Sequence, residues 1–147
     1  MKLQSINPHD QSVVGEVEIS TAEDVVLAVS RARGAFSGWR HTPIEERIAY
    51  IKKYRQKIAE HKEEIARLTT LEMGKPLKQS LEDVDFELGF LDYYVTKGAE
   101  NLADEPVFEE KNEYYRAVFE PYGVVAAIAP WNFPLSMANS GIIPALV

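Results

Sequence analysis

Residues 120–134 have the sequence EPYGVVAAIAPWNFP, which combines several local signals. Its middle, Val124–Ile128, is apolar at every position, as expected of a strand buried on both faces of a parallel sheet. Pro130 and Pro134 stand two residues either side of Asn132 and restrict the backbone there. Pro134 also suits the first turn of a helix. The stretch therefore predicts a strand, a braced turn and a helix, which is the repeating unit of an α/β protein.

In an open α/β sheet, ligands bind beyond the carboxyl ends of the strands, where residues 130–134 would lie. An amide fixed at Asn132 can donate an N–H to an oxygen that becomes negative in a transition state. An asparagine just ahead of a helix can instead only cap or turn the backbone, and Trp131 can be a packing residue. On the chemistry of these residues alone, the structural role of Asn132 is the more common one.

The residues before this stretch have the spacing of amphipathic helices. Thr21, with Asp24 three residues later, predicts one helix start. Thr42 predicts a second start as the N-cap, with Pro43 at the first helical position and Glu45 completing a capping box.

The remaining elements are predicted from glycine and proline residues that end helices and from a change in the spacing of apolar residues. A third helix is expected to stop at Gly74–Pro76, where glycine ends a helix and proline prevents its continuation. A fourth is expected to begin at Ser80 and to run toward Leu102. Residues 114–120 alternate like a strand, and the polar tract 110–113 before them predicts a hairpin turn.

Composition excludes several classes of function. A net charge of −7 over 147 residues argues against a nucleic-acid partner, because phosphate binding needs clustered Lys and Arg. The absence of cysteine excludes disulfides, thiolate metal sites and a cysteine nucleophile within these residues. His9, His41 and His61 lack ligand spacing, so no metal site is predicted. No apolar run approaches the ~20 residues that span a bilayer and no signal peptide is evident, which predicts a cytoplasmic protein without a membrane partner.

The order of motifs along the chain resembles the aldehyde dehydrogenase superfamily. The string Pro-Trp-Asn-Phe-Pro at 130–134, after Pro-x-Gly-Val-Val at 121–125, is the most specific match. The stretch 72–76 is similar to the family's Glu-x-Gly-Lys-Pro turn. Further matches are Asn7-Pro8, Gly15-Glu16-Val17, Ala35-Phe36 with Trp39, and Glu46-Arg47. The sequence is therefore identified as similar to the N-terminal segment of an NAD(P)-dependent aldehyde dehydrogenase.

This resemblance implies an α/β fold class, as the N-terminal part of the aldehyde dehydrogenase fold. Residues 1–106 would form the helical N-terminal part of the cofactor-binding domain. Residues 107–120 would form an oligomerisation arm, and residues 121–147 the first strand–helix unit of a Rossmann-like cofactor domain, truncated at its end. The resemblance also implies a homo-oligomer, a dimer or a tetramer, in which paired arms cover their open strand edges.

The resemblance also assigns candidate site residues. Asn132 matches the asparagine whose amide, with a backbone N–H, stabilises the oxyanion formed when a thiolate adds to an aldehyde. The strand end that lies along the NAD or NADP cofactor is matched by Ile128, Ala129, Pro130, Trp131 and Asn132. In intact members, the aldehyde is oxidised to a carboxylic acid. The nucleophilic cysteine, the general-base glutamate and the other cofactor-binding segments would follow Val147, so the cofactor site is incomplete and the isolated chain is expected to be inactive.

A second function stays open, which is a non-catalytic interaction module that pairs with a full-length aldehyde dehydrogenase. A free-standing cofactor-binding domain is disfavoured, because most of the family's cofactor contacts are missing here. Ser140 and Gly141 stand where the succinate-semialdehyde branches usually have arginine and lysine, which argues against succinate semialdehyde. The sequence leaves open which aldehyde is used, NAD against NADP, and the size of the oligomer.

Overall fold

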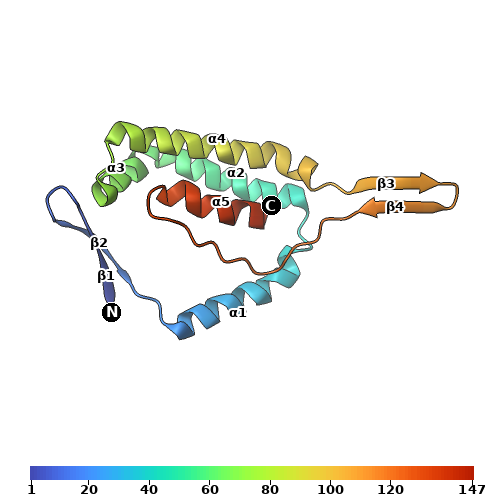
Figure 1. Cartoon of the computed structure of the whole chain (residues 1–147), viewed down its shortest axis with the longest axis horizontal. Coiled ribbons are helices and arrows are strands. Elements are labelled where there is room, and N and C mark those ends of the chain that lie inside the picture. The colour runs from blue at the N-terminus through green and yellow to red at the C-terminus, as the bar shows by residue number, and fades with distance from the viewer.

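The computed structural model describes residues 1–147 and contains five helices and two antiparallel hairpins (Figure 1). The elements are β1 (Lys2–Ile6), β2 (Val13–Glu18), α1 (Ala22–Trp39), α2 (Ile44–Glu60), α3 (Lys62–Met73), α4 (Leu77–Asn101), β3 (Glu105–Glu110), β4 (Glu113–Ala117) and α5 (Pro134–Leu146). The structure has no helix that is both long enough and apolar enough to cross a membrane.

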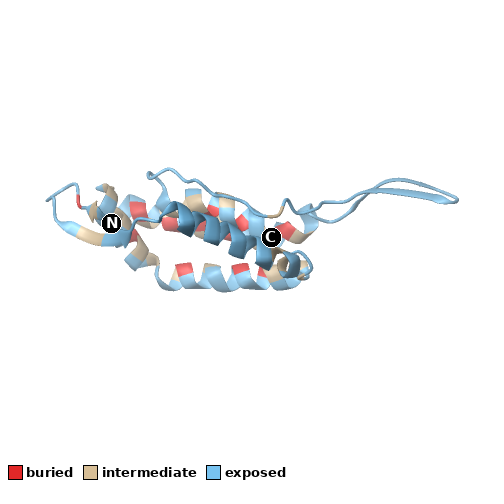
Figure 2. Ribbon diagram, turned by 90° about the horizontal axis from the view of Figure 1, so that it is seen from below, coloured by how far each residue is buried: buried red, intermediate tan, exposed pale blue.

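The core lies between the four helices α2, α3, α4 and α5, whose buried residues face one another (Figure 2). Ile51 and Ile58 of α2 meet Val84 and Leu91 of α4, and Ile143 adds the apolar face of α5. Leu91 is completely buried. By contrast α1 has no buried residue, so it does not contribute to this core.

The first two helix starts differ in how well local sequence predicts them. Thr21 caps α1, accepting from the backbone N–H of Asp24, while the Asp24 carboxylate accepts from the backbone N–H of Thr21. The prediction for α2 is wrong by one residue, because Pro43 is the N-cap and no side chain caps the helix. The Thr42 hydroxyl instead donates to the carbonyl of Gly38 at 3.3 Å, which ties it to the end of α1.

The junction between α3 and α4 has the predicted stop. Gly74 ends α3 with a φ of 72°, in the left-handed region that glycine adopts without strain. A Cβ at this position would also lie 3.0 Å from Cγ of Pro8, so the N-terminal hairpin packs closely here. Pro76 is the N-cap of α4, which therefore begins at Leu77 and not at Ser80.

One hairpin is predicted and one is not. β3 and β4 pair in register from Glu105 opposite Ala117 to Glu110 opposite Glu113, which confirms the predicted turn in the polar tract. The β1–β2 hairpin lies within residues 1–106, for which the sequence analysis predicts helices and no hairpin. Leu3 and Ile6 are three residues apart in β1, and β2 begins with two apolar residues in a row, so the period-2 signal of this hairpin is weak.

The expected buried strand at Val124–Ile128 is not formed as a strand in this chain. It runs as irregular chain beside α5 (Figure 1), and Ile128 is 95% exposed. A parallel strand needs a neighbour to receive its N–H and C=O groups, and no other strand lies beside this segment. The apolar run is present as predicted, but the pairing that would make it a strand is not.

Candidate functional site

The segment that carries the predicted site runs from the end of the β3–β4 hairpin to the start of α5. Its side chains are mostly open to solvent, with Trp131 78% exposed. Ala129, Pro130 and Asn132 are exposed as well. The structure thus brings the five predicted site residues together as one continuous exposed stretch, residues 128–132.

Asn132 stands at the turn into α5. Pro134 occupies the first turn of this helix, as predicted, and the N-cap is Phe133, with no side chain bonded to the helix end. The Asn132 side chain is therefore not used as a helix cap. The backbone carbonyl of Asn132 accepts a hydrogen bond of 3.1 Å from Nζ of Lys75. The amide side chain is exposed, which leaves its N–H groups available to a ligand.

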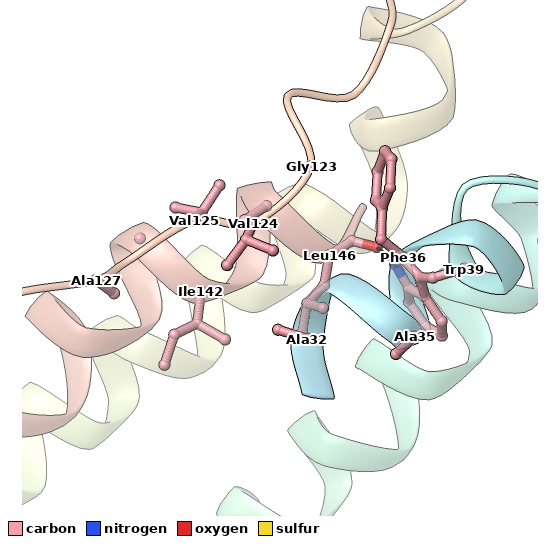
Figure 3. Close-up of a pocket in the computed structure, with 12 residues that line it drawn as sticks. Ala32, Ala35, Phe36, Trp39, Gly123, Val124, Val125, Ala127, Ile142 and Leu146 are labelled. Carbon is pink, nitrogen blue, oxygen red and sulfur yellow. Dashed lines mark hydrogen bonds between the residues drawn. The ribbon is translucent and has the colours of Figure 1, made fainter. Parts of the chain in front are cut away.

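An apolar hollow of about 430 Å³ lies next to this segment, between α1, residues 123–127 and α5 (Figure 3). Phe36 and Trp39 close it on the side of α1, and Ile142 and Leu146 on the side of α5. Ten of its twelve lining residues are hydrophobic, so the hollow suits apolar side chains and lacks the polar groups that orient a small ligand. None of the five predicted site residues lines it.

The close approach of the segment to α5 depends on a small residue. A Cβ built on Gly141 would lie 2.9 Å from Cβ of Ala127, which is shorter than any ordinary carbon contact. Gly141 is one of the two positions at which the sequence departs from the succinate-semialdehyde branches. Here its lack of a side chain lets Ala127 lie directly on the helix.

A buried polar network fixes α5 against α2 and α4, and the sequence reasoning missed it. The Asn139 amide donates to Oε1 of Glu87 at 2.7 Å, and the Tyr54 hydroxyl donates to Oδ1 of Asn139 at 3.1 Å. Glu87 is 0% exposed, and its Oε2 has no partner. Burial raises the pKa of the Glu87 carboxyl, and the polar side chains of Asn139 and Ser136 oppose that rise. The signal was present, since Glu87 falls between Val84 and Leu91 on the apolar stripe of α4.

Lys75 was also missed as a contact residue. In the sequence, residues 74–76 indicate a helix stop and form part of the family motif at 72–76, and neither signal predicts a contact of Lys75. In the structure, Lys75 Nζ lies 2.6 Å from Oδ2 of Asp83 and 4.1 Å from the centroid of the Phe133 ring. These contacts join the α3–α4 junction to the turn at Asn132.

The histidines take part in local contacts only. Nδ1 of His41 lies 2.7 Å from the carbonyl of Ser37, and Nδ1 of His61 lies 2.8 Å from a carboxylate oxygen of Glu64. No group of three or more His, Asp or Glu side chains gathers at a spacing that could hold a metal ion.

Comparison with known proteins gives consistent matches along the whole chain. The profile described as "Aldehyde dehydrogenase family" matches residues 1–147. "Aminoaldehyde dehydrogenase 2, peroxisomal" from Malus domestica is 36% identical, over 99% of this chain and 30% of the relative. "Betaine aldehyde dehydrogenase 1" from Oryza sativa subsp. japonica is 35% identical with the same coverage.

Solved structures agree with the sequence matches. A crystal structure of a point mutant of betaine aldehyde dehydrogenase from Staphylococcus aureus, in complex with NAD⁺, superposes with a TM-score of 0.91 at 36% identity. The match covers 99% of this chain and 30% of that one. The chain thus spans about 30% of the length of the relatives it matches.

Proposed function

The chain belongs to the aldehyde dehydrogenase family and has the fold of that family's N-terminal part, and on this premise we propose that it supplies the oxyanion-binding asparagine of an NAD(P)-dependent aldehyde oxidation. The observation that carries the proposal is the placement of Asn132. Its side chain is exposed and its backbone carbonyl is held 3.1 Å from Lys75 Nζ.

The chemical role of Asn132 is electrostatic. When a nucleophile adds to an aldehyde carbon, the carbonyl oxygen becomes negative, and a fixed amide N–H stabilises that charge at little cost in reorganisation. The chain contains no cysteine, so the thiolate nucleophile of the family lies outside these residues. For the same reason we predict that the isolated chain has no dehydrogenase activity.

The cofactor is proposed to lie along residues 128–132. These residues are exposed, and their peptide groups make no hydrogen bonds to a neighbouring strand. The backbone is therefore free to contact the nicotinamide ring, and the segment can form one side of a cofactor site. NAD(P)⁺, when bound, would accept hydride from the aldehyde carbon. Because residues 128–132 form only one side of the site and do not enclose the cofactor, titration of the isolated chain with NAD⁺ is expected to give no saturable binding.

The proposal is tested by joining the chain to the rest of a working enzyme. Residues 1–147 replace the matching N-terminal part of the Staphylococcus aureus betaine aldehyde dehydrogenase, and NAD⁺ reduction is followed with betaine aldehyde and with small aminoaldehydes, the substrates named for its relatives. We expect turnover by the hybrid and none by the isolated chain. A folded, oligomeric hybrid without turnover on any aldehyde would contradict the proposal.

A second role, in assembly, is favoured by the β3–β4 hairpin. The hairpin projects away from the helices (Figure 1), and each of its residues from 105 to 117 is exposed (Figure 2). Both of its long edges carry free backbone groups, and such edges are covered in stable proteins. We propose that a second subunit covers the hairpin, as an oligomerisation arm or as an interaction module for a full-length enzyme.

This second role predicts a change in molecular mass. Val107 is 69% exposed on β3, and Val107→Asp would place a charge in the proposed interface. The hybrid enzyme is then expected to sediment as a smaller species, whereas Lys111→Ser in the turn leaves the mass unchanged. An unchanged mass for Val107→Asp would exclude the hairpin as the main contact.

A further inference from the structure

Residues 118–132 are almost free of hydrogen bonds to the rest of the chain. No backbone hydrogen bond tethers them, and the one side-chain bond they receive runs from Lys75 Nζ to the carbonyl of Asn132. A loop of this length without ladder bonds or buried side chains is mobile unless a specific contact fixes it. The one hydrogen bond that holds this segment to the rest of the chain therefore falls on Asn132, the residue whose position matters most for the proposed function.

Lys75, which donates this hydrogen bond, is itself rigidly placed. Lys75 lies between Gly74, which ends α3, and Pro76, which is the N-cap of α4. The Lys75 side chain is 15% exposed, and that of Asp83, one turn and a half into α4, is 26% exposed. Their 2.6 Å contact is thus shielded from solvent, where an ion pair is weakened less than at an open surface.

Three neighbours contact the ammonium group of Lys75, namely Asp83, Asn132 and Phe133. It has three N–H donors, of which one is directed at Asp83 and one at the Asn132 carbonyl. It also lies 4.1 Å from the centroid of the Phe133 ring, within the range of a cation–π contact. One cation therefore contacts both residues of the turn that precedes α5.

Holding a carbonyl also orients the peptide group that follows it. The peptide unit is planar, so the C=O of Asn132 and the N–H of Phe133 point in opposite directions. With the carbonyl turned toward Lys75, the Phe133 N–H faces away from the α3–α4 junction. The Cα of Asn132, and with it the root of the amide side chain, is fixed relative to the helical core.

We propose that Lys75, supported by Asp83, is a positioning residue for Asn132. This inference rests on the proposed function for the identity of Asn132 as the oxyanion donor. It adds that the donor is held by a cation at the α3–α4 junction, which acts through the backbone carbonyl of Asn132. A misplacement of about 1 Å in such a donor can lower a rate about 100-fold.

The test uses the chain itself and needs no activity. In a Trp39→Phe background, Trp131 is the one remaining tryptophan, and its time-resolved fluorescence anisotropy reports motion of the turn. We expect Lys75→Met to lower the residual anisotropy of Trp131, because the turn would then move more freely on the nanosecond timescale. Lys75→Arg, which keeps a cationic donor, is expected to restore most of the order.

Lys78→Met is the matched control. Lys78 lies on α4, three residues after Lys75, is 88% exposed and pairs with Glu82 at 3.9 Å, so its loss is expected to leave Trp131 unchanged. The helical content of each variant is checked by circular dichroism. If Lys75→Met disturbs the helices, Asp83→Asn replaces it, since this variant keeps the shape of the side chain and removes only its charge.

The anisotropy of Trp131 in these variants decides the inference. A drop in Trp131 order with intact helices, rescued by arginine, supports the inference. Unchanged Trp131 order in Lys75→Met, or in Asp83→Asn where that variant is used, would overturn it. Because the measurement involves no turnover, an inactive hybrid enzyme would contradict the proposed function and leave the anchoring of the turn to be judged on its own.

Discussion

Replacing Glu87 with glutamine is expected to remove a pH dependence from the stability of the helical core. Glu87 is 0% exposed, and its Oε2 has no hydrogen-bond partner. Burial raises the pKa of its carboxyl above the ordinary value of 4.5. The folded chain therefore keeps the Glu87 proton to a higher pH than the unfolded chain does.

The sign of the effect follows from this difference. Below pH 4.5, the carboxyl is protonated in both states and the unfolding free energy does not depend on it. As the pH rises through the raised pKa of the folded state, stability is lost, at no more than about 1.36 kcal/mol per pH unit for one proton. A buried polar atom without a partner costs about 1–3 kcal/mol, and a charged one costs more, so we expect a loss of at least about 1 kcal/mol.

Urea unfolding at a fixed low protein concentration, followed by circular dichroism between pH 4 and pH 8, measures this loss. Glu87→Gln keeps the acceptor for Asn139 and cannot ionise, so it is expected to match the unaltered chain at pH 4 and to exceed it by at least about 1 kcal/mol at pH 8. Glu82→Gln, at a 62% exposed side chain on the same helix, is the control and shows no such divergence. Parallel stabilities of Glu87→Gln and the unaltered chain across this range would refute the reasoning.

Three further predictions follow from packing and exposure. Leu91→Ala, at a fully buried position, is expected to lower the unfolding free energy by about 2–5 kcal/mol in the same urea assay, and a loss below 1 kcal/mol would contradict the assigned core. Gly141→Ala places a Cβ 2.9 Å from that of Ala127 and is expected to increase proteolysis of residues 120–130 without loss of helix content; an unchanged cleavage rate would count against that contact. The chain exposes 10894 Å², against about 7,600 Å² for a compact monomer of its mass, so light scattering is expected to show self-association that increases with concentration, and a monodisperse monomer at all concentrations would contradict this.

Local sequence signals predicted the elements that depend on local contacts. The capping box at Thr21 is satisfied within four residues, and the stop at Gly74 follows from backbone conformation alone. The error at Thr42 has a physical cause, because its hydroxyl bonds back to the preceding helix instead of forward to α2. Pro130 and Pro134, which restrict the backbone on either side of Asn132, were also evident in the sequence.

Contacts between distant segments could not be read from the sequence. The apolar run Val124–Ile128 predicts a buried strand, but a strand exists only where another strand pairs with it. Lys75 and Asn132 are 57 residues apart, and nothing in the local pattern of either residue indicates the other. The assignment of Asn132, and of residues 128–131 as one side of the cofactor site, thus rests on family resemblance, and both remain predictions.

The rate of the hybrid enzyme with alanine at position 132 tests the central claim most directly. Loss of one oxyanion donor is expected to lower kcat by about 100- to 1,000-fold while KM changes little, because the amide contacts the oxygen mainly in the transition state. Asn101→Ala, at an exposed asparagine that donates to Tyr93, is the control and retains the full rate. A kcat for Asn132→Ala within a few-fold of that control would contradict the account.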